Sequence, residues 1–228
     1  MNKADRYCLI SPHYFSKKLE PPFYRDLVDV FEDRMRYWML KPAEKLLNER
    51  TDKIAAVGIL LNYFEGIEIY LSGKDSKNAS FQFFQEGFKK VFGIDVSNSD
   101  NSISKSNIKE ASRVLYTQAR CGFAHDGLFR NNVLFGEISK NAILISWPKP
   151  DGKLLFDNGA ESIVINPTRF YECIKYHFEQ YLSQLKSQRD EVLVYSFKKA
   201  VSLKWGLEKE YRVIAMPKPE FISNSTAP

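Results

Sequence analysis

The fold follows most directly from residues 51–73, TDKIAAVGILLNYFEGIEIYLSG. Thr51 and Asp52 are residue types that cap the start of a helix, and Gly73 is the type that most often ends one. The first turns after Asp52 are apolar on nearly every side, which is typical of a helix surrounded by other helices. We therefore expect a central helix over about 53–72 in a mainly helical bundle.

Helical periodicity continues on both sides of this segment. Apolar residues recur at three- and four-residue spacing after Pro22, which predicts a helix to about Arg50 that Pro42 kinks or divides. A loop rich in serine and asparagine is expected at 96–106. Further helices are predicted at 79–92, at 107–124 and from Pro167 to 187.

The sequence pattern changes between the fourth predicted helix and Pro167. Short β-branched or aromatic segments alternate with Asn, Asp and Gly, and Asp151-Gly152 and Asn158-Gly159 are hairpin turn signals. The predicted strands are 133–135, 142–147, 153–156 and 162–165. These features predict a small antiparallel β insertion at about 128–166, between the last two long helices of the bundle.

The chain divides into three parts. They are an N-terminal arm at 1–21, an up-and-down helical bundle with its β insertion at 22–187, and a C-terminal extension at 188–228. Within the extension, 192–197 fits either a strand or a continued helix, and 211–215 fits a late strand. Residues 217–228 are expected to be disordered.

Composition favours a soluble cytoplasmic protein. The N-terminus is polar and has no signal-peptide core, and the most apolar segment is interrupted by Asn62, Glu65 and Glu68. The three cysteines are far apart and lack zinc-site spacing, so neither a disulfide framework nor a metal site is expected. The net charge of +5 is compatible with an acidic partner such as nucleic acid.

Most common catalytic signatures are missing from this sequence. It contains no GxGxxG, no GxxxxGK[ST], no HExxH and no GxSxG, so neither a nucleotide cofactor nor a catalytic metal is expected. What remains is the stretch YTQARCGFAHDG at 116–127, with Arg120 and His125 near the end of a helix. Histidine can take or give a proton near neutral pH, and arginine binds phosphate and developing negative charge. This pair suits the cleavage of RNA without a metal.

A purely structural interpretation of Arg120 and His125 also stays open. A histidine at a helix C-terminus is often only a cap, and an arginine one turn earlier is often a solvated or ion-paired surface residue. Five residues on an ideal helix also rotate through about 140°, so Arg120 and His125 do not share one face. Either a distorted last turn at Gly122 or a second copy of the chain would have to complete the site.

The segment 115–127 resembles the R-x(4–6)-H signature of the HEPN superfamily, in particular its bacterial Abi-like and toxin-like members. Residues 62–73 and 81–92 are also similar to that subgroup, and the resemblance spans roughly 23–187. It implies a helical bundle that forms a homodimer, with both Arg–His pairs in one cleft. It further implies metal-independent endoribonuclease activity, often as the toxin partner of an antitoxin protein or in phage defence.

By the same resemblance, His125 is the proton donor or acceptor and Arg120 binds the phosphate. Many catalytic members have a polar residue directly after the arginine, where this chain has Cys121, which favours a binding-only member. The alternative function is therefore a non-catalytic HEPN-like module that binds a nucleotide, RNA or a protein partner. Asp126 would tune His125 or form a turn, and Tyr116 is a further supporting candidate.

Glu65 has two interpretations. It points into the same cleft and orients His125 or an arginine, or it forms an ordinary salt bridge just outside the core. The other two histidines, His13 and His177, have no partners nearby in the sequence, so we interpret them as structural or exposed.

Overall fold

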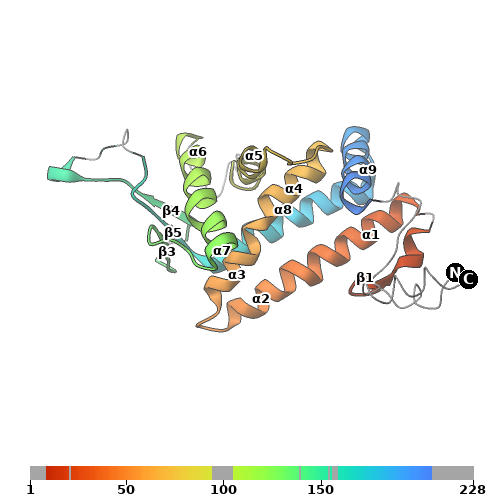
Figure 1. The fold of residues 1–228 in the computed structure, drawn as a ribbon, viewed down its shortest axis with the longest axis horizontal. Helices are drawn as coiled ribbons and strands as arrows, with labels where there is room; N and C mark the ends of the chain where they lie inside the picture. The colour runs from red at the N-terminus through yellow and green to blue at the C-terminus, as the bar shows by residue number, and fades with distance from the viewer. Residues whose placement is uncertain are drawn as a thin grey trace, which may run out of the picture.

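A computed structural model describes residues 9–20, 22–93, 105–138, 140–153, 155 and 159–206. The predicted late strand at 211–215, the predicted disorder at 217–228 and most of the predicted loop at 96–106 lie outside these residues. The described part is mainly helical, with a small sheet at one end of the molecule and α9 towards the other (Figure 1).

One long helical run forms the N-terminal side of the bundle. It consists of α1 (Tyr24–Arg34), the π-helical turn η3 (Met35–Leu40) and α2 (Lys41–Asn48). Pro42 neither breaks nor sharply divides this run. The wider turn before it bonds the backbone N–H of Lys41 to the carbonyl of Arg36, one residue further back than in an α-helix. The π turn accommodates the proline, which lacks an N–H.

The central helix lies where the sequence predicts it. It is made of α3 (Lys53–Leu60) and α4 (Asn62–Ser72), and it ends at Gly73 with a left-handed φ of 65°. The predicted helix at 79–92 is α5 (Ser80–Phe92), where Phe84, Phe88 and Phe92 are buried against Phe64 of α4.

By length and composition, Lys53–Ser72 is apolar enough to cross a membrane, and no other helix in the described residues is. More than half of its apolar window, 56%, is buried inside the protein. Its carboxylates are ion-paired within the bundle, Glu65 with Arg120 and Glu68 with Lys90. These are the properties of a core helix in a soluble protein.

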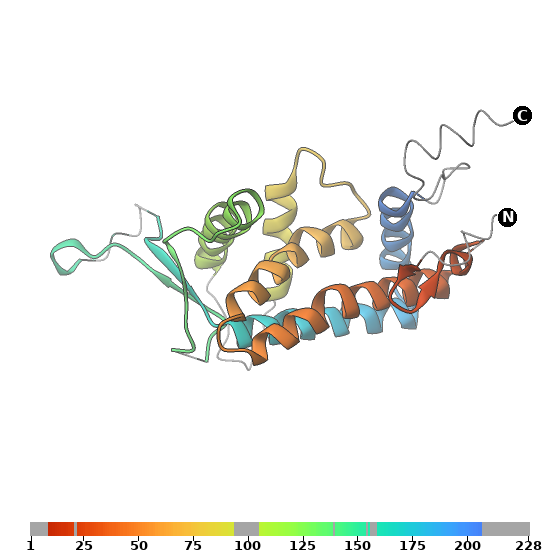
Figure 2. The same cartoon turned by 60° about the horizontal axis from the view of Figure 1, so that its bottom comes forward.

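The remaining helices enclose this centre. They are α6 (Lys105–Val114), the π-helical turn η4 (Leu115–Arg120), α7 (Cys121–Asp126), α8 (Pro167–Ser187) and α9 (Glu191–Trp205). The helix α8 runs beside α1 and α2, as both views show (Figures 1 and 2). The ambiguous segment 192–197 is helical, because Asp190 caps α9 and Phe197 is buried beside Phe31 of α1. The β insertion therefore lies before two long helices, α8 and α9, and not between the last two long helices as predicted.

The sheet corrects the predicted antiparallel meander. Its strands β3 (Val133–Phe135), β4 (Ile143–Ser146) and β5 (Ser162–Ile165) have the order β3-β5-β4. The pair β3–β5 is parallel and the pair β4–β5 is antiparallel. Neither described residue of the predicted strand 153–156, Lys153 or Leu155, belongs to a strand.

Burial explains this arrangement. Ile163 and Ile165 of β5 are fully buried, so this strand takes the centre, with Val133 and Ile143 buried on its neighbours. The turn at Asp151-Gly152 does form, with φ values of 51° and 80°. Turn residues thus mark where the chain reverses, but the apolar side chains decide which strands pair.

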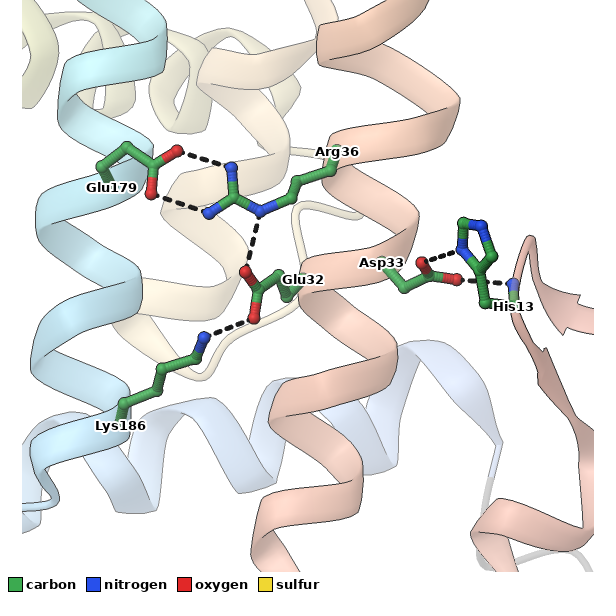
Figure 3. A network of polar contacts seen from close by, with 6 residues as sticks. All are labelled: His13, Glu32, Asp33, Arg36, Glu179 and Lys186. Atoms are coloured by element: carbon green, nitrogen blue, oxygen red, sulfur yellow. Dashed lines mark hydrogen bonds and ion pairs between the residues drawn. The ribbon is translucent and has the colours of Figure 1, made fainter.

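Polar contacts bind the N-terminal elements to the bundle (Figure 3). The guanidinium of Arg36 on η3 donates two hydrogen bonds to Glu179 of α8, at 2.6 and 2.8 Å, and a third to Glu32 at 2.8 Å. Lys186 reaches the same Glu32 at 2.5 Å. The predicted arm contains a short strand pair, β1 (Leu9–Ser11) and β2 (Tyr14–Phe15), followed by a 3-10 turn, η2 (Ser16–Leu19).

Candidate functional site

The motif lies on the last turns of one helical run, α6–η4–α7. The run ends at Gly127, whose φ of 72° is left-handed and whose N–H bonds to the carbonyl of Phe123 at 3.2 Å. The chain then folds back across Gly122, where an added Cβ would lie 2.8 Å from the carbonyl oxygen of Leu128. Glycine at 122 therefore lets the return segment lie directly against the motif helix.

Arg120 is held towards the core. Its Nη2 donates to Oε2 of Glu65 on α4 at 3.1 Å, and its guanidinium carbon lies 5.8 Å from the ring centre of Tyr116. The two charged side chains are mostly buried, at 25% exposed for Arg120 and 16% for Glu65. Within the described residues the buried Nε of Arg120 has no hydrogen-bond partner. Glu65 therefore forms a salt bridge with Arg120, which fits both interpretations that the sequence leaves open for it.

Tyr116 and Cys121 complete this inner cluster. Burial raises the pKa of the Tyr116 phenol, and Cys121 and Glu65 add to the rise while Arg120 opposes it. The phenol is therefore protonated at neutral pH, and it is a potential hydrogen-bond donor. Cys121 is a free, partly buried thiol next to Tyr116.

His125 lies on a different side of the helix. Its side chain is exposed on the final turn of α7, and no hydrogen bond or ion pair in the described part of the chain joins it to Arg120. The intervening residues are α-helical, so the rotation of about 140° between the two positions is not removed by the π turn before Arg120. One chain thus brings Arg120 to Glu65 and Tyr116 but not to His125. The Asp126 side chain lies outside the described residues.

The return segment supplies a cation that the motif does not contain. Arg130 donates its backbone N–H to the carbonyl of Gln118 at 3.2 Å, and its Cγ would lie 3.5 Å from a Cβ at Gly122. Three residues on an α-helix rotate through about 300°, so Gly122 and His125 lie only about 60° apart on one side. The exposed Arg130 side chain therefore starts on the same side of the helix as His125.

The sequence alone does not predict that Arg130 lies beside the motif helix. Only the close approach at Gly122, followed by the helix end at Gly127, signals that the chain after the motif folds back over it.

No group of three or more His, Cys, Asp or Glu side chains suited to a metal ion occurs among the described residues. Comparison of the chain with protein-family models, with curated proteins and with solved structures finds no match.

Proposed function

We propose that this protein is a metal-independent endoribonuclease of the HEPN type, centred on Arg120 and His125. The observation that supports it best is the exposed histidine on the last turn of a bundle helix, with an arginine on either side of that helix. An exposed imidazole is accessible to a large substrate such as RNA, and histidine is the side chain most often used for general acid–base catalysis.

The proposed reaction is attack of a ribose 2′-hydroxyl on the adjacent phosphorus. His125 takes the 2′-hydroxyl proton or gives one to the leaving 5′-oxygen, and the product end is a 2′,3′-cyclic phosphate. An arginine binds the phosphate and stabilises the charge that develops on it. RNA is thus the proposed partner, and the proposed setting is a cytoplasmic toxin or phage-defence protein controlled by an antitoxin protein.

Two arrangements supply the arginine. In a homodimer, Arg120 of one copy lies near His125 of the other, which overcomes their separation on a single helix. Within one chain, Arg130 serves instead, because it lies on the His125 side. In the second arrangement Arg120 is a positioning residue that holds α7 against α4 through Glu65.

A second candidate is a non-catalytic module that binds RNA, a nucleotide or a protein. Two observations favour it: a thiol at Cys121 instead of a polar group, and an Arg120 side chain already engaged by Glu65. This candidate predicts binding without turnover, and binding that survives His125→Ala.

The deciding experiment is cleavage of single-stranded RNA in EDTA by the wild type, His125→Ala and Arg120→Ala. We expect chelator-resistant cleavage by the wild type and a loss of about 100- to 10,000-fold in His125→Ala, the usual contribution of a general acid or base. Cleavage that disappears in EDTA, yet persists in both variants, contradicts the proposal. RNA binding without cleavage by the wild type favours the second candidate.

A mixing experiment separates the two arrangements. If the site is shared between copies, equimolar His125→Ala and Arg120→Ala chains restore part of the activity, because mixed dimers contain one intact pair. If Arg130 acts within one chain, mixing restores nothing and Arg130→Ala is itself impaired.

A further inference from the structure

A separate pocket lies between α4, α5 and α8, on elements that do not include the motif. Its volume is about 240 Å³, and its lining residues are Leu71, Lys90, His177, Gln180, Tyr181 and Gln184. The four from α8 are spaced i, i+3, i+4 and i+7, so one side of that helix faces the pocket. That side carries an imidazole, two amides and a phenol, a polar set for the wall of a helical bundle.

One edge of the His177 ring is fixed in the protein interior. Its Nδ1 lies 2.8 Å from the hydroxyl of Tyr63, which is 1% exposed. Burial raises the pKa of Tyr63 well above its ordinary value, so the phenol keeps its proton. Among the described residues the buried Tyr63 hydroxyl has no other hydrogen-bond partner, so we assign the phenol as the donor and Nδ1 as the acceptor. A neutral imidazole that accepts at Nδ1 carries its own proton on Nε2. The Nε2 edge of the His177 ring, which is left to face the pocket, is therefore a hydrogen-bond donor.

Lys90 adds positive charge beside this donor. Burial and the nearby Lys90 ammonium lower the pKa of His177 to about 4, so the ring is neutral at physiological pH. Lys90 pairs with Glu68 of α4, whose side chain is only 10% exposed, whereas that of Lys90 is 41% exposed. An ammonium has three donors, so two remain after the bond to Glu68.

The remaining walls fit a small molecule with an anionic end. Leu71 and the ring of Tyr181 are apolar, and the exposed amides of Gln180 and Gln184 lie on the same side of α8 as His177. None of the lining side chains is a carboxylate, and Glu68 is already neutralised by Lys90. An anion in this pocket therefore meets hydrogen-bond donors and no unpaired negative group.

We propose that this pocket binds a small molecule through a phosphate or carboxylate group, which accepts hydrogen bonds from Nε2 of His177 and from the ammonium of Lys90. The apolar part of the ligand lies on Leu71 and Tyr181, and Gln180 and Gln184 contact its polar edge. This site is independent of the ribonuclease proposal, because it shares no residue with the motif.

The test is a titration of the full chain at pH 7 with inorganic phosphate and, separately, with acetate, against sodium chloride at matched ionic strength. The readout is the C2 proton resonance of His177 in NMR spectra, which is readily assigned because the chain has only three histidines. We expect at least one probe to shift this resonance saturably while the His13 resonance stays in place. The probe that acts identifies the anionic group.

Lys90→Met and its neighbour Lys89→Met form the matched pair of variants. Lys89 is 63% exposed and pairs with Glu86, away from the pocket lining. Loss of one charge-assisted hydrogen bond weakens binding about tenfold in Lys90→Met, and Lys89→Met binds like the wild type. Gln184→Leu, at the exposed rim, serves as a second variant that leaves the Glu68 ion pair intact and also weakens binding.

Two results overturn the proposal. One is the absence of any saturable shift with either probe up to about 10 mM, a range that includes millimolar affinities. The other is a shift that is unchanged in both Lys90→Met and Gln184→Leu. A shift of the His125 resonance alone is a case of the first result, and it assigns anion binding to the motif instead of the pocket.

Discussion

His125 and His177 are the same residue type in two opposite settings. His125 is exposed on the last turn of α7, and the motif residues Arg120, Gly122 and Gly127 lie within five residues of it in the sequence. His177 lies in the middle of α8, and its partners come from other helices, Tyr63 of α4 and Lys90 of α5. A search along the chain finds the first kind of site and overlooks the second, because tertiary packing alone creates the second.

The largest expected difference between these histidines is in RNA cleavage. His125→Gln should lower the rate by about 100- to 10,000-fold, because it removes the proposed proton-transfer group. His177→Gln should leave the rate within about twofold, because the pocket lies on other helices. Initial rates on one RNA in EDTA provide the measurement. Equal losses in both variants would mean that the comparison is wrong and that His177 affects the site through the fold.

The next largest difference between the two histidines is in how the free energy of unfolding depends on pH. Burial and the nearby Lys90 hold the pKa of His177 at about 4, below its ordinary value of 6.5. Between these values the unfolded chain binds a proton at His177 and the folded chain does not, so acid favours unfolding. The free energy of unfolding should therefore fall by about 3 kcal/mol from this residue as the pH drops from 6.5 to 4.

Urea denaturation of the wild type and His177→Gln at several pH values isolates this contribution. The stability gap between them should narrow as the pH falls through this window, because only the wild type has the histidine to protonate. His125→Gln is the control for the loss of a histidine that lies outside the pocket. A constant gap for His177→Gln would show that the ring is not desolvated.

The two histidines also show how much the sequence predicts. Helices can be predicted well from the sequence because local periodicity and end residues encode them: Gly73 ends the central helix where expected, and Phe84, Phe88 and Phe92 of the predicted helix 79–92 are buried. Strand pairing cannot be predicted in this way. The position of β5 between β3 and β4 depends on the burial of Ile163 and Ile165, which the local pattern does not encode.

The same division holds for the candidate sites. The motif and the two open roles of Glu65 are visible in the sequence, and Arg130 and the His177 pocket are not. The position of Arg130 depends on where the chain returns after the turn at Gly127. The pocket depends on which side of α8 faces α4 and α5. The interpretation of His13 and His177 as structural or exposed residues fits the fold, but their partners lie far away in the sequence: His13 binds Asp33, and His177 binds Tyr63.

A smaller effect separates the two arginines near His125. Arg120→Ala leaves the mostly buried Glu65 without its partner, so it should lower the free energy of unfolding by about 2 kcal/mol. Arg130→Ala removes an exposed side chain and should change stability by less than about 0.5 kcal/mol. Urea denaturation of both variants measures this contrast. If Arg130→Ala is the less stable variant, the ion pair of Arg120 with Glu65 is not the stabilising contact that its burial indicates.

The third histidine, His13, should give the smallest effect. Its Nδ1 lies 2.6 Å from Asp33 of α1, and its backbone N–H donates to the same carboxylate at 2.9 Å (Figure 3). Burial alone would raise the pKa of Asp33, but the hydrogen bonds from His13 and the nearby Ser11 hydroxyl outweigh it and lower the pKa.

His13→Ala removes only the side-chain contact, and the His13 ring is 55% exposed, so the expected loss of stability is below about 1 kcal/mol. Urea denaturation gives the size of the loss, and limited proteolysis shows whether the β1–β2 hairpin is released from α1. A loss that exceeds that of His177→Gln at neutral pH would reverse the ranking, because an exposed contact would then stabilise the fold more than a buried one.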